Sequence, residues 1–135
     1  MPTIKTATNR VVADEPGPDD THVQVVWFGP TQDGLHRKVF EGPLLPTEQF
    51  DEAIAWAREM ADQMVHPLYV VPLRGVEVLR TDEVRRGVAS LTDQQRGQLR
   101  ERVVATLAKV LLDSDDAVVR EDAYSILVQM KVVKP

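Results

Sequence analysis

The stretch Leu68-Tyr69-Val70-Val71-Pro72-Leu73 decides the fold of this chain. Successive side chains of a strand point to opposite faces of a sheet, so a run that is apolar at every position predicts an interior strand covered on both sides. Pro72 cannot donate a backbone hydrogen bond, which predicts weaker pairing near the end of this strand. The rest of the chain must therefore supply two apolar layers, one for each face.

An amphipathic helix over residues 47–64 is predicted to be the first of these layers. Pro46 breaks the chain before it, Thr47 is positioned to cap its first turn, and His66-Pro67 ends it. Its apolar side chains repeat at three and four residues and are Phe50, Ala53, Ile54, Ala57, Met60, Ala61 and Met64. Trp56 lies at the margin of this stripe, where a tryptophan either completes a core or projects into an interface.

A β-hairpin is predicted over residues 22–41. Val and aromatic residues fill His22–Phe28, turn residues fill 29–34, and Leu35–Phe40 alternates again. With Trp27 opposite Leu35, one face is apolar and the other largely polar, and burial favours that register. The apolar face then holds Val23, Val25, Trp27, Leu35 and Val39, and the polar face holds His22, Gln24, Val26, His36, Lys38 and Phe40.

These elements predict a sheet-and-helix body over residues 22–80, in the order β-β-α-β-β, with residues 76–79 as the last strand of a small antiparallel sheet. Residues 1–21 are predicted to be a flexible N-terminal arm, because residues 14–20 hold two prolines, a glycine and four acids. Within this arm, Arg10–Ala13 is able to add an edge strand.

The C-terminal region, residues 81–135, is predicted to be wholly helical. A short helix opens at residue 81, Thr92 and Gln95 match a capping box for a helix to about Leu112, and a last helix spans about 117–131. The apolar stripes of the two long helices are Leu99, Val103, Leu107, Val110 and Leu111, and Val119, Ala123, Ile126, Leu127 and Met130. The predicted fold class is therefore α+β, with a C-terminal helical hairpin packed on the body or on a second subunit.

The last helix is similar to the second helix of a HEAT-type repeat, in the pattern Val119-Arg120-x-x-Ala123-x-x-Ile126-Leu127 after an Asp-rich turn. The similarity covers less than a third of the chain. Solenoid repeats need about three copies to bury a continuous core, and the sequence holds no second copy. The resemblance implies a style of helix packing and no function.

Charge divides the chain where the pattern changes. Residues 14–66 hold eleven Asp and Glu against three Lys and Arg, whereas residues 74–109 hold eight Lys and Arg against five acids. The net charge of −5 disfavours general affinity for nucleic acid. The chain has no cysteine, no apolar run long enough to span a bilayer and no apolar segment after Met1. We expect a cytoplasmic protein with no membrane partner, and the eleven Arg against five Lys favour a bacterial or phage source.

No residue set predicts a metal site or a bound cofactor. A zinc site needs three or four ligands, and His22, His36 and His66 have no further ligand near them in sequence. The acidic turn 113–116 lacks the central glycine of a calcium loop, so it is predicted to cap helices.

No pattern predicts catalysis either. The carboxylate pairs Asp51/Glu52 and Glu121/Asp122 are expected on the solvent-facing sides of helices, where pKa values are not tuned for acid–base work. The sequence also lacks a Gly-x-Ser-x-Gly turn and a glycine-rich phosphate loop. We therefore expect a protein that is not an enzyme.

Arginines gather in the basic region, at Arg74, Arg80, Arg85, Arg86, Arg96, Arg100 and Arg102. We favour a solvated surface over a nucleic-acid site, because nearby acids offset this charge and no aromatic residue is interleaved for base stacking.

The leading hypothesis is a non-enzymatic interaction or regulatory protein, of the adaptor or inhibitor type, that binds another protein or itself. The alternatives are a nucleic-acid-associated regulator acting through residues 74–109 and a small enzyme whose site is not visible in sequence. The residues predicted to form the interface are Trp56, Met60, Arg96, Arg100, Val104 and Ala108.

Overall fold

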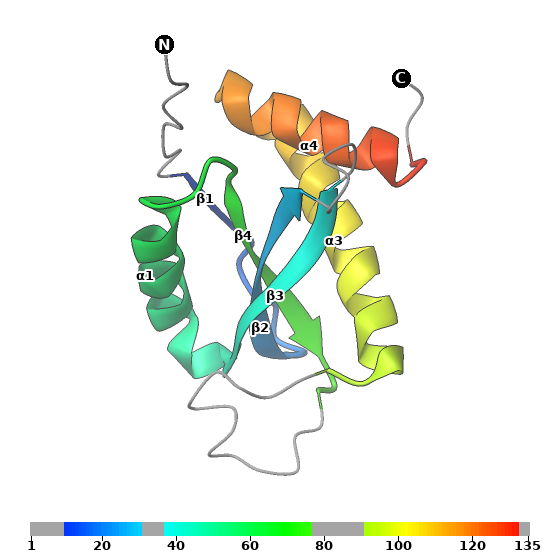
Figure 1. The fold of residues 1–135 in the computed structure, drawn as a ribbon. Helices are drawn as coiled ribbons and strands as arrows, with labels where there is room; N and C mark the ends of the chain where they lie inside the picture. The colour runs from blue at the N-terminus through cyan, green and yellow to red at the C-terminus, as the bar shows by residue number, and fades with distance from the viewer. Residues whose placement is uncertain (1–9, 31–36, 77–90, 133–135) are drawn as a thin grey trace.

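The computed structural model describes residues 10–30, 37–76 and 91–132. A four-stranded sheet forms the middle layer, with α1 on one face and α3 and α4 on the other (Figure 1). The strands are β1 (Val11–Ala13), β2 (Asp20–Pro30), β3 (Arg37–Pro46) and β4 (Leu68–Arg74), and the helices are α1 (Phe50–Ala61), α3 (Asp93–Asp113) and α4 (Ala117–Gln129). The predicted α+β class with a C-terminal helix pair is confirmed.

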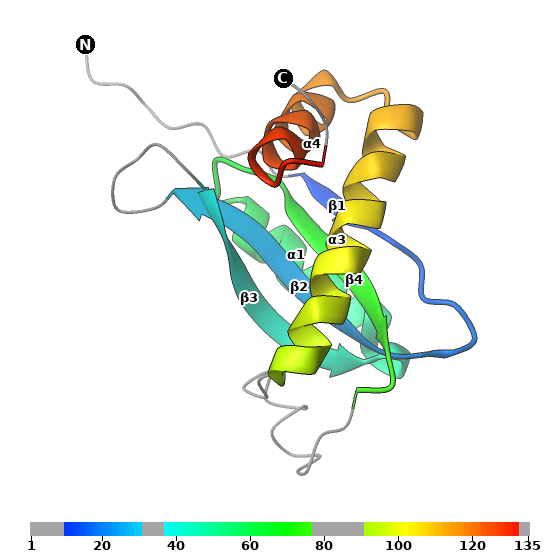
Figure 2. The same cartoon turned by 90° about the vertical axis from the view of Figure 1, so that its right-hand side faces the viewer.

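Strand β4 is an interior strand, as its sequence predicts. The sheet order is β1-β4-β2-β3, and every residue from Leu68 to Leu73 is buried. Tyr69, Val71 and Leu73 pack towards α3 and α4, whereas Leu68 and Val70 pack towards α1. Figure 2 shows α3 crossing in front of the sheet and α1 lying behind it. Both apolar layers therefore come from the same chain.

The sheet is mixed, because β1 runs parallel to β4. The backbone of β1 is held at both ends, since the Leu68 N–H donates to the Arg10 carbonyl at 3.1 Å and the Asp14 N–H donates to the Val70 carbonyl at 3.0 Å. Residues 10–20, predicted as part of a flexible arm, are thus attached to the sheet and continue into β2. Residues 1–9 lie outside the described residues.

The predicted register of the hairpin is wrong. Trp27 pairs with Phe40, and the register shifts between Gln24 and Val26. Val26 and Gln24 are both buried, at 0% and 1% exposure. The prediction assumed one solvated face, but helices cover both faces of this sheet, so alternation of polarity does not report the register.

Helix α1 is shorter than predicted. A 3-10 turn over Thr47–Gln49 precedes it, Thr47 makes no capping hydrogen bond, and the helix ends at Ala61. Ala53, Ala57 and Ala61 are fully buried against the sheet. Small side chains at this spacing let the helix backbone approach the sheet closely.

The two C-terminal helices begin at the predicted capping residues. The Gln95 N–H donates to Thr92 Oγ1 at 3.2 Å and the Thr92 N–H donates to Gln95 Oε1 at 3.0 Å, which completes the capping box of α3. Asp116 caps α4 by accepting from the Val118 and Val119 N–H groups. The apolar stripes of both helices lie in the core with β4. The strand predicted over 76–79 and the helix predicted from residue 81 fall on residues 77–90, outside the described part of the chain.

Candidate functional site

A buried polar cluster joins α4 to the sheet. The Tyr69 hydroxyl donates to Asp122 Oδ2 at 2.8 Å, and Arg37 Nη1 donates to Asp122 Oδ1. His66 Nδ1 lies 3.4 Å from the same Oδ1. Arg37 also donates through Nε and Nη2 to the Phe28 carbonyl, at 3.1 and 2.8 Å. The carboxylate and the guanidinium therefore neutralise each other inside the protein.

The prediction that Asp122 faces solvent is wrong. Its side chain is only 6% exposed. It falls three residues after Val119 and four before Ile126, which is the spacing of the buried stripe of α4, so its position is the signal that was missed. Burial, and secondarily the Asp122 carboxylate, raise the pKa of Tyr69 far above its usual value, so its hydroxyl stays a donor. The cluster consists of groups that satisfy one another, which is the arrangement of a structural lock.

A groove of about 350 Å³ opens beside this cluster, between β2, β3, α3 and the end of α4. We call it the α3–α4 groove. Its lining residues are Phe28, Arg37, Val39, Arg96, Leu99, Arg100, Val103, Ile126, Gln129 and Met130. Its floor is apolar and its rim carries arginines, so it can accept an apolar group that is flanked by negative charge.

Polar contacts hold the walls of the α3–α4 groove in place. The Arg37 N–H donates to Gln129 Oε1 at 2.8 Å, and Gln129 Nε2 donates to the Arg37 carbonyl. Arg96 Nε lies 3.3 Å from Glu41 Oε2, which ties α3 to β3. The groove is therefore formed before any partner arrives.

The predicted interface residues divide between the two sides of the sheet. Trp56 and Met60 pack, half-buried, against the core beneath α1, and the Trp56 ring lies 6.1 Å from the Trp27 ring. Arg96 and Arg100 line the α3–α4 groove, whereas Val104 packs on the core of the other face and Ala108 is exposed. The structure thus brings Arg96 and Arg100 together and places the two α1 residues elsewhere. Sequence reasoning missed the lining residues from the sheet because it misplaced the register.

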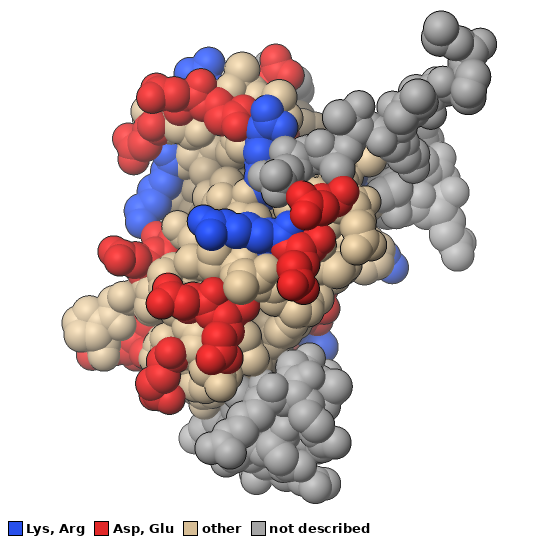
Figure 3. Space-filling view, turned by 90° about the vertical axis from the view of Figure 1, so that its left-hand side faces the viewer, with Lys and Arg blue, Asp and Glu red and all other residues tan. Residues whose placement is uncertain are grey.

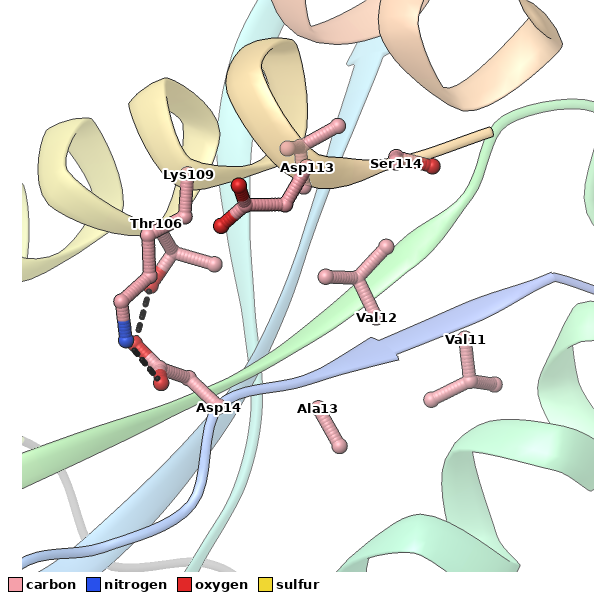
Figure 4. Close-up of a pocket in the computed structure, with 9 residues that line it drawn as sticks. Val11, Val12, Ala13, Asp14, Thr106, Lys109, Asp113 and Ser114 are labelled. Atoms are coloured by element: carbon pink, nitrogen blue, oxygen red, sulfur yellow. Dashed lines mark hydrogen bonds and ion pairs between the residues drawn. The ribbon is translucent and has the colours of Figure 1, made fainter. Parts of the chain in front are cut away.

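A polar pocket of about 320 Å³ lies between β1 and α3. Figure 4 shows Asp14 reaching from the end of β1 towards Lys109 and Thr106 on α3. Its Oδ1 lies 2.8 Å from Lys109 Nζ, and Thr106 Oγ1 donates to its Oδ2 at 3.1 Å. The hydrogen bond to Asp14 raises the pKa of Lys109. These contacts use the charged groups to anchor the N-terminal strand.

An aromatic pocket of about 410 Å³ lies at the far end of the hairpin. Trp27, Phe40 and His66 line it, and the Trp27 and Phe40 rings stack at 5.8 Å. Its lining provides an imidazole but no serine, threonine or cysteine that could act as a nucleophile. It gives the enzyme alternative no reacting group to build on.

Charge differs between the two faces of the molecule. Figure 3 shows acidic side chains gathered over the face that α1 covers, and the exposed acids of this region are Glu48, Asp51, Glu52, Glu59 and Asp62. The α3–α4 groove on the other face carries Arg37, Arg96 and Arg100. The separation of charge predicted along the sequence is therefore also a separation in space.

Two further searches cover only the residues that the structure describes. Among them, no group of three or more metal-ligating side chains is close enough to hold an ion. Within the same ranges, none of the helices has the length and apolar character needed to cross a bilayer.

Comparison of the chain with protein-family models, curated proteins and solved structures finds no match. The HEAT-type pattern of the last helix therefore remains a matter of helix packing. Any assignment of function depends on the residues of this chain.

Proposed function

We propose that this chain is a non-enzymatic protein-binding module, of the adaptor or inhibitor type, that receives a partner protein in the α3–α4 groove. The observation that carries the proposal is the combination of an apolar floor with an arginine rim. Arginine and large apolar groups are enriched where proteins bind one another, and charged rims steer the encounter. A cytoplasmic location in a bacterial or phage system is part of the proposal, and the absence of cysteine is compatible with it.

The partner groove is supported by what the polar groups elsewhere are doing. Among the described residues, Asp122, Tyr69 and Arg37 satisfy one another, and Asp14 is occupied by Lys109 and Thr106. Catalysis needs a group whose proton or lone pair is open to a substrate. The exposed guanidinium groups of the groove are open to a partner instead.

Self-association is a second form of the same proposal. Leu112, at the end of α3, is 84% exposed, and Val118, at the start of α4, is 43% exposed. Exposed apolar side chains beside one turn favour contact with a second copy or another protein. A nucleic-acid function receives less support, because Arg96 and Arg102 already lie beside the carboxylates of Glu41 and Asp20.

Affinity capture from a lysate of the host cells tests the proposal. The tagged full-length chain is compared at micromolar concentration with an Arg96→Ala/Arg100→Ala variant, with and without nuclease. The matched control is Arg58→Ala/Arg120→Ala, which removes two exposed arginines that do not line the groove. Trp56→Ala reports on the α1 face, and circular dichroism verifies that each variant is folded.

We expect a nuclease-resistant partner that the control retains and the groove variant loses. Recovery of no partner, or equal retention by the groove variant, would overturn the proposal. Loss of the partner on nuclease treatment would favour the nucleic-acid alternative. Sedimentation of the purified chain over a range of concentrations measures self-association separately.

A further inference from the structure

We propose that the occupant of the α3–α4 groove is an acidic amphipathic helix of a partner protein, which inserts one large apolar side chain between two carboxylates. The inference rests on the proposed function because it specifies the partner of the same groove. It commits to a peptide segment whose negative charges face α3.

The apolar floor selects the anchor. Phe28, Leu99, Val103 and Ile126 line it, with exposures between 1% and 5%, so their surfaces are open only towards the groove. Val39, which is 46% exposed, extends this surface along β3. A volume of about 350 Å³ is near the lower end of ligand pockets, and it suits one or two large side chains. Leu, Met or an aromatic residue is the anchor that this floor would take.

Two arginines on α3 select the charge. Arg96 and Arg100 are four residues apart, so they lie on the same side of the helix about 6 Å apart along its axis. Carboxylates one helical turn apart on a partner helix have the same spacing. A helical partner can therefore present an acid to each arginine with its apolar anchor beside them.

The two guanidinium groups differ in how far they are already engaged. Arg100 is exposed and makes no ion pair with any residue in the described ranges. Arg96 lies 3.3 Å from Glu41 and 3.7 Å from Asp93, and the Arg96 side chain is 45% exposed. Exposed pairs of this kind contribute little to stability, so a partner carboxylate can replace them at small cost.

Arg37 is excluded as a receptor for the partner's charge. Its side chain is only 16% exposed, and its three guanidinium nitrogens donate to Asp122 and to the Phe28 carbonyl. The sheet side of the groove therefore binds the apolar anchor and the α3 side binds the carboxylates. This polarity fixes which side of the partner helix faces α3.

The experiment uses a display library of 16-residue helical peptides, with both charged and apolar positions randomised. The library is selected on the full-length chain, and each pool is then tested on an Arg100→Glu variant. Arg100→Glu is the informative change because it breaks no ion pair within the described ranges. Arg120→Glu, on the exposed side of α4, is the matched control.

We expect enriched peptides to carry Asp or Glu at positions i and i+4, with a Leu, Met or aromatic residue between them. Fluorescence anisotropy of a synthetic copy should show binding weakened about tenfold by Arg100→Glu and unchanged by Arg120→Glu. A copy with the facing Glu changed to Lys should bind Arg100→Glu better than it binds the wild-type chain. Affinity for the acidic peptide should fall as salt rises.

Enrichment of basic or neutral peptides, or the absence of any peptide that Arg100→Glu weakens, would overturn the inference. Such a result leaves the proposed function to be decided by the capture experiment, where a partner may still require the groove without being an acidic helix. Failure of both experiments removes the groove as a binding site altogether.

Discussion

The Tyr69 hydroxyl donates a hydrogen bond of 2.8 Å to the carboxylate of Asp122, a residue 53 positions further along the chain. This contact joins the central strand to the last helix across the core. Tyr69 also packs edge-to-face against Phe28, with ring centroids 6.0 Å apart. The bond therefore links the lock beneath α4 with the floor of the α3–α4 groove.

Removal of the Asp122 carboxylate should destabilise the protein strongly. Asp122→Ala leaves the Arg37 guanidinium and the Tyr69 hydroxyl buried with one partner fewer, and we expect a loss of about 3–5 kcal/mol in the free energy of unfolding. Tyr69→Phe removes one donor to a charged acceptor and should cost about 2 kcal/mol. Urea denaturation followed by circular dichroism measures both.

The adjacent Glu121 provides the control for Asp122, because it lies on the same helix but is exposed. Glu121→Gln should change the free energy of unfolding by less than about 0.5 kcal/mol. Equal effects of Asp122→Ala and Glu121→Gln would contradict the description of Asp122 as the centre of the lock.

Two glycines should respond to alanine with opposite signs. A Cβ at Gly42 would lie 3.0 Å from Trp27 Cζ3 and 3.1 Å from the Val25 carbonyl oxygen, so Gly42→Ala should destabilise by about 1–3 kcal/mol. A Cβ at Gly97, within α3, would meet nothing within 4 Å, and Gly97→Ala should stabilise by about 0.5–1 kcal/mol. Thermal unfolding of the two variants should shift in opposite directions.

The elements of this fold were predictable wherever a local signal specified them. β4 is apolar at every position, and Thr92 with Gln95 specifies the start of α3, so strand and helix follow from neighbouring residues. β1 has three residues, and its parallel partner is more than fifty positions away, so its place depends on contacts that sequence does not show locally.

The α3–α4 groove was predictable only on its helical side. Arg96 and Arg100 share a helix face by their spacing alone. Phe28 and Val39 face each other only because β2 and β3 pair in the observed register, with a shift between Gln24 and Val26. That irregularity has no sequence signature here, so the sheet side of the groove could not be derived.

The attachment of β1 to α3 should be locally, rather than globally, important. Asp14 receives hydrogen bonds from Thr106 and from Lys109, whose side chain is 64% exposed. Asp14→Ala should therefore accelerate amide hydrogen exchange in β1 and leave exchange in α1 unchanged. Uniform acceleration across the chain would show instead that the contact supports the whole fold.

His22 should make the protein less stable in mild acid. Burial lowers the pKa of His22 from its ordinary value of 6.5, and Glu48 opposes this only in part. The unfolded chain therefore binds a proton that the folded chain resists, so the stabilising contribution is present above pH 6.5 and is lost as the pH falls through the folded pKa. His22→Gln should flatten this part of the profile, measured by urea denaturation from about pH 8 to about pH 5. Nuclear magnetic resonance titration of the His22 ring checks the cause directly, and a pKa at or above 6.5 would contradict it.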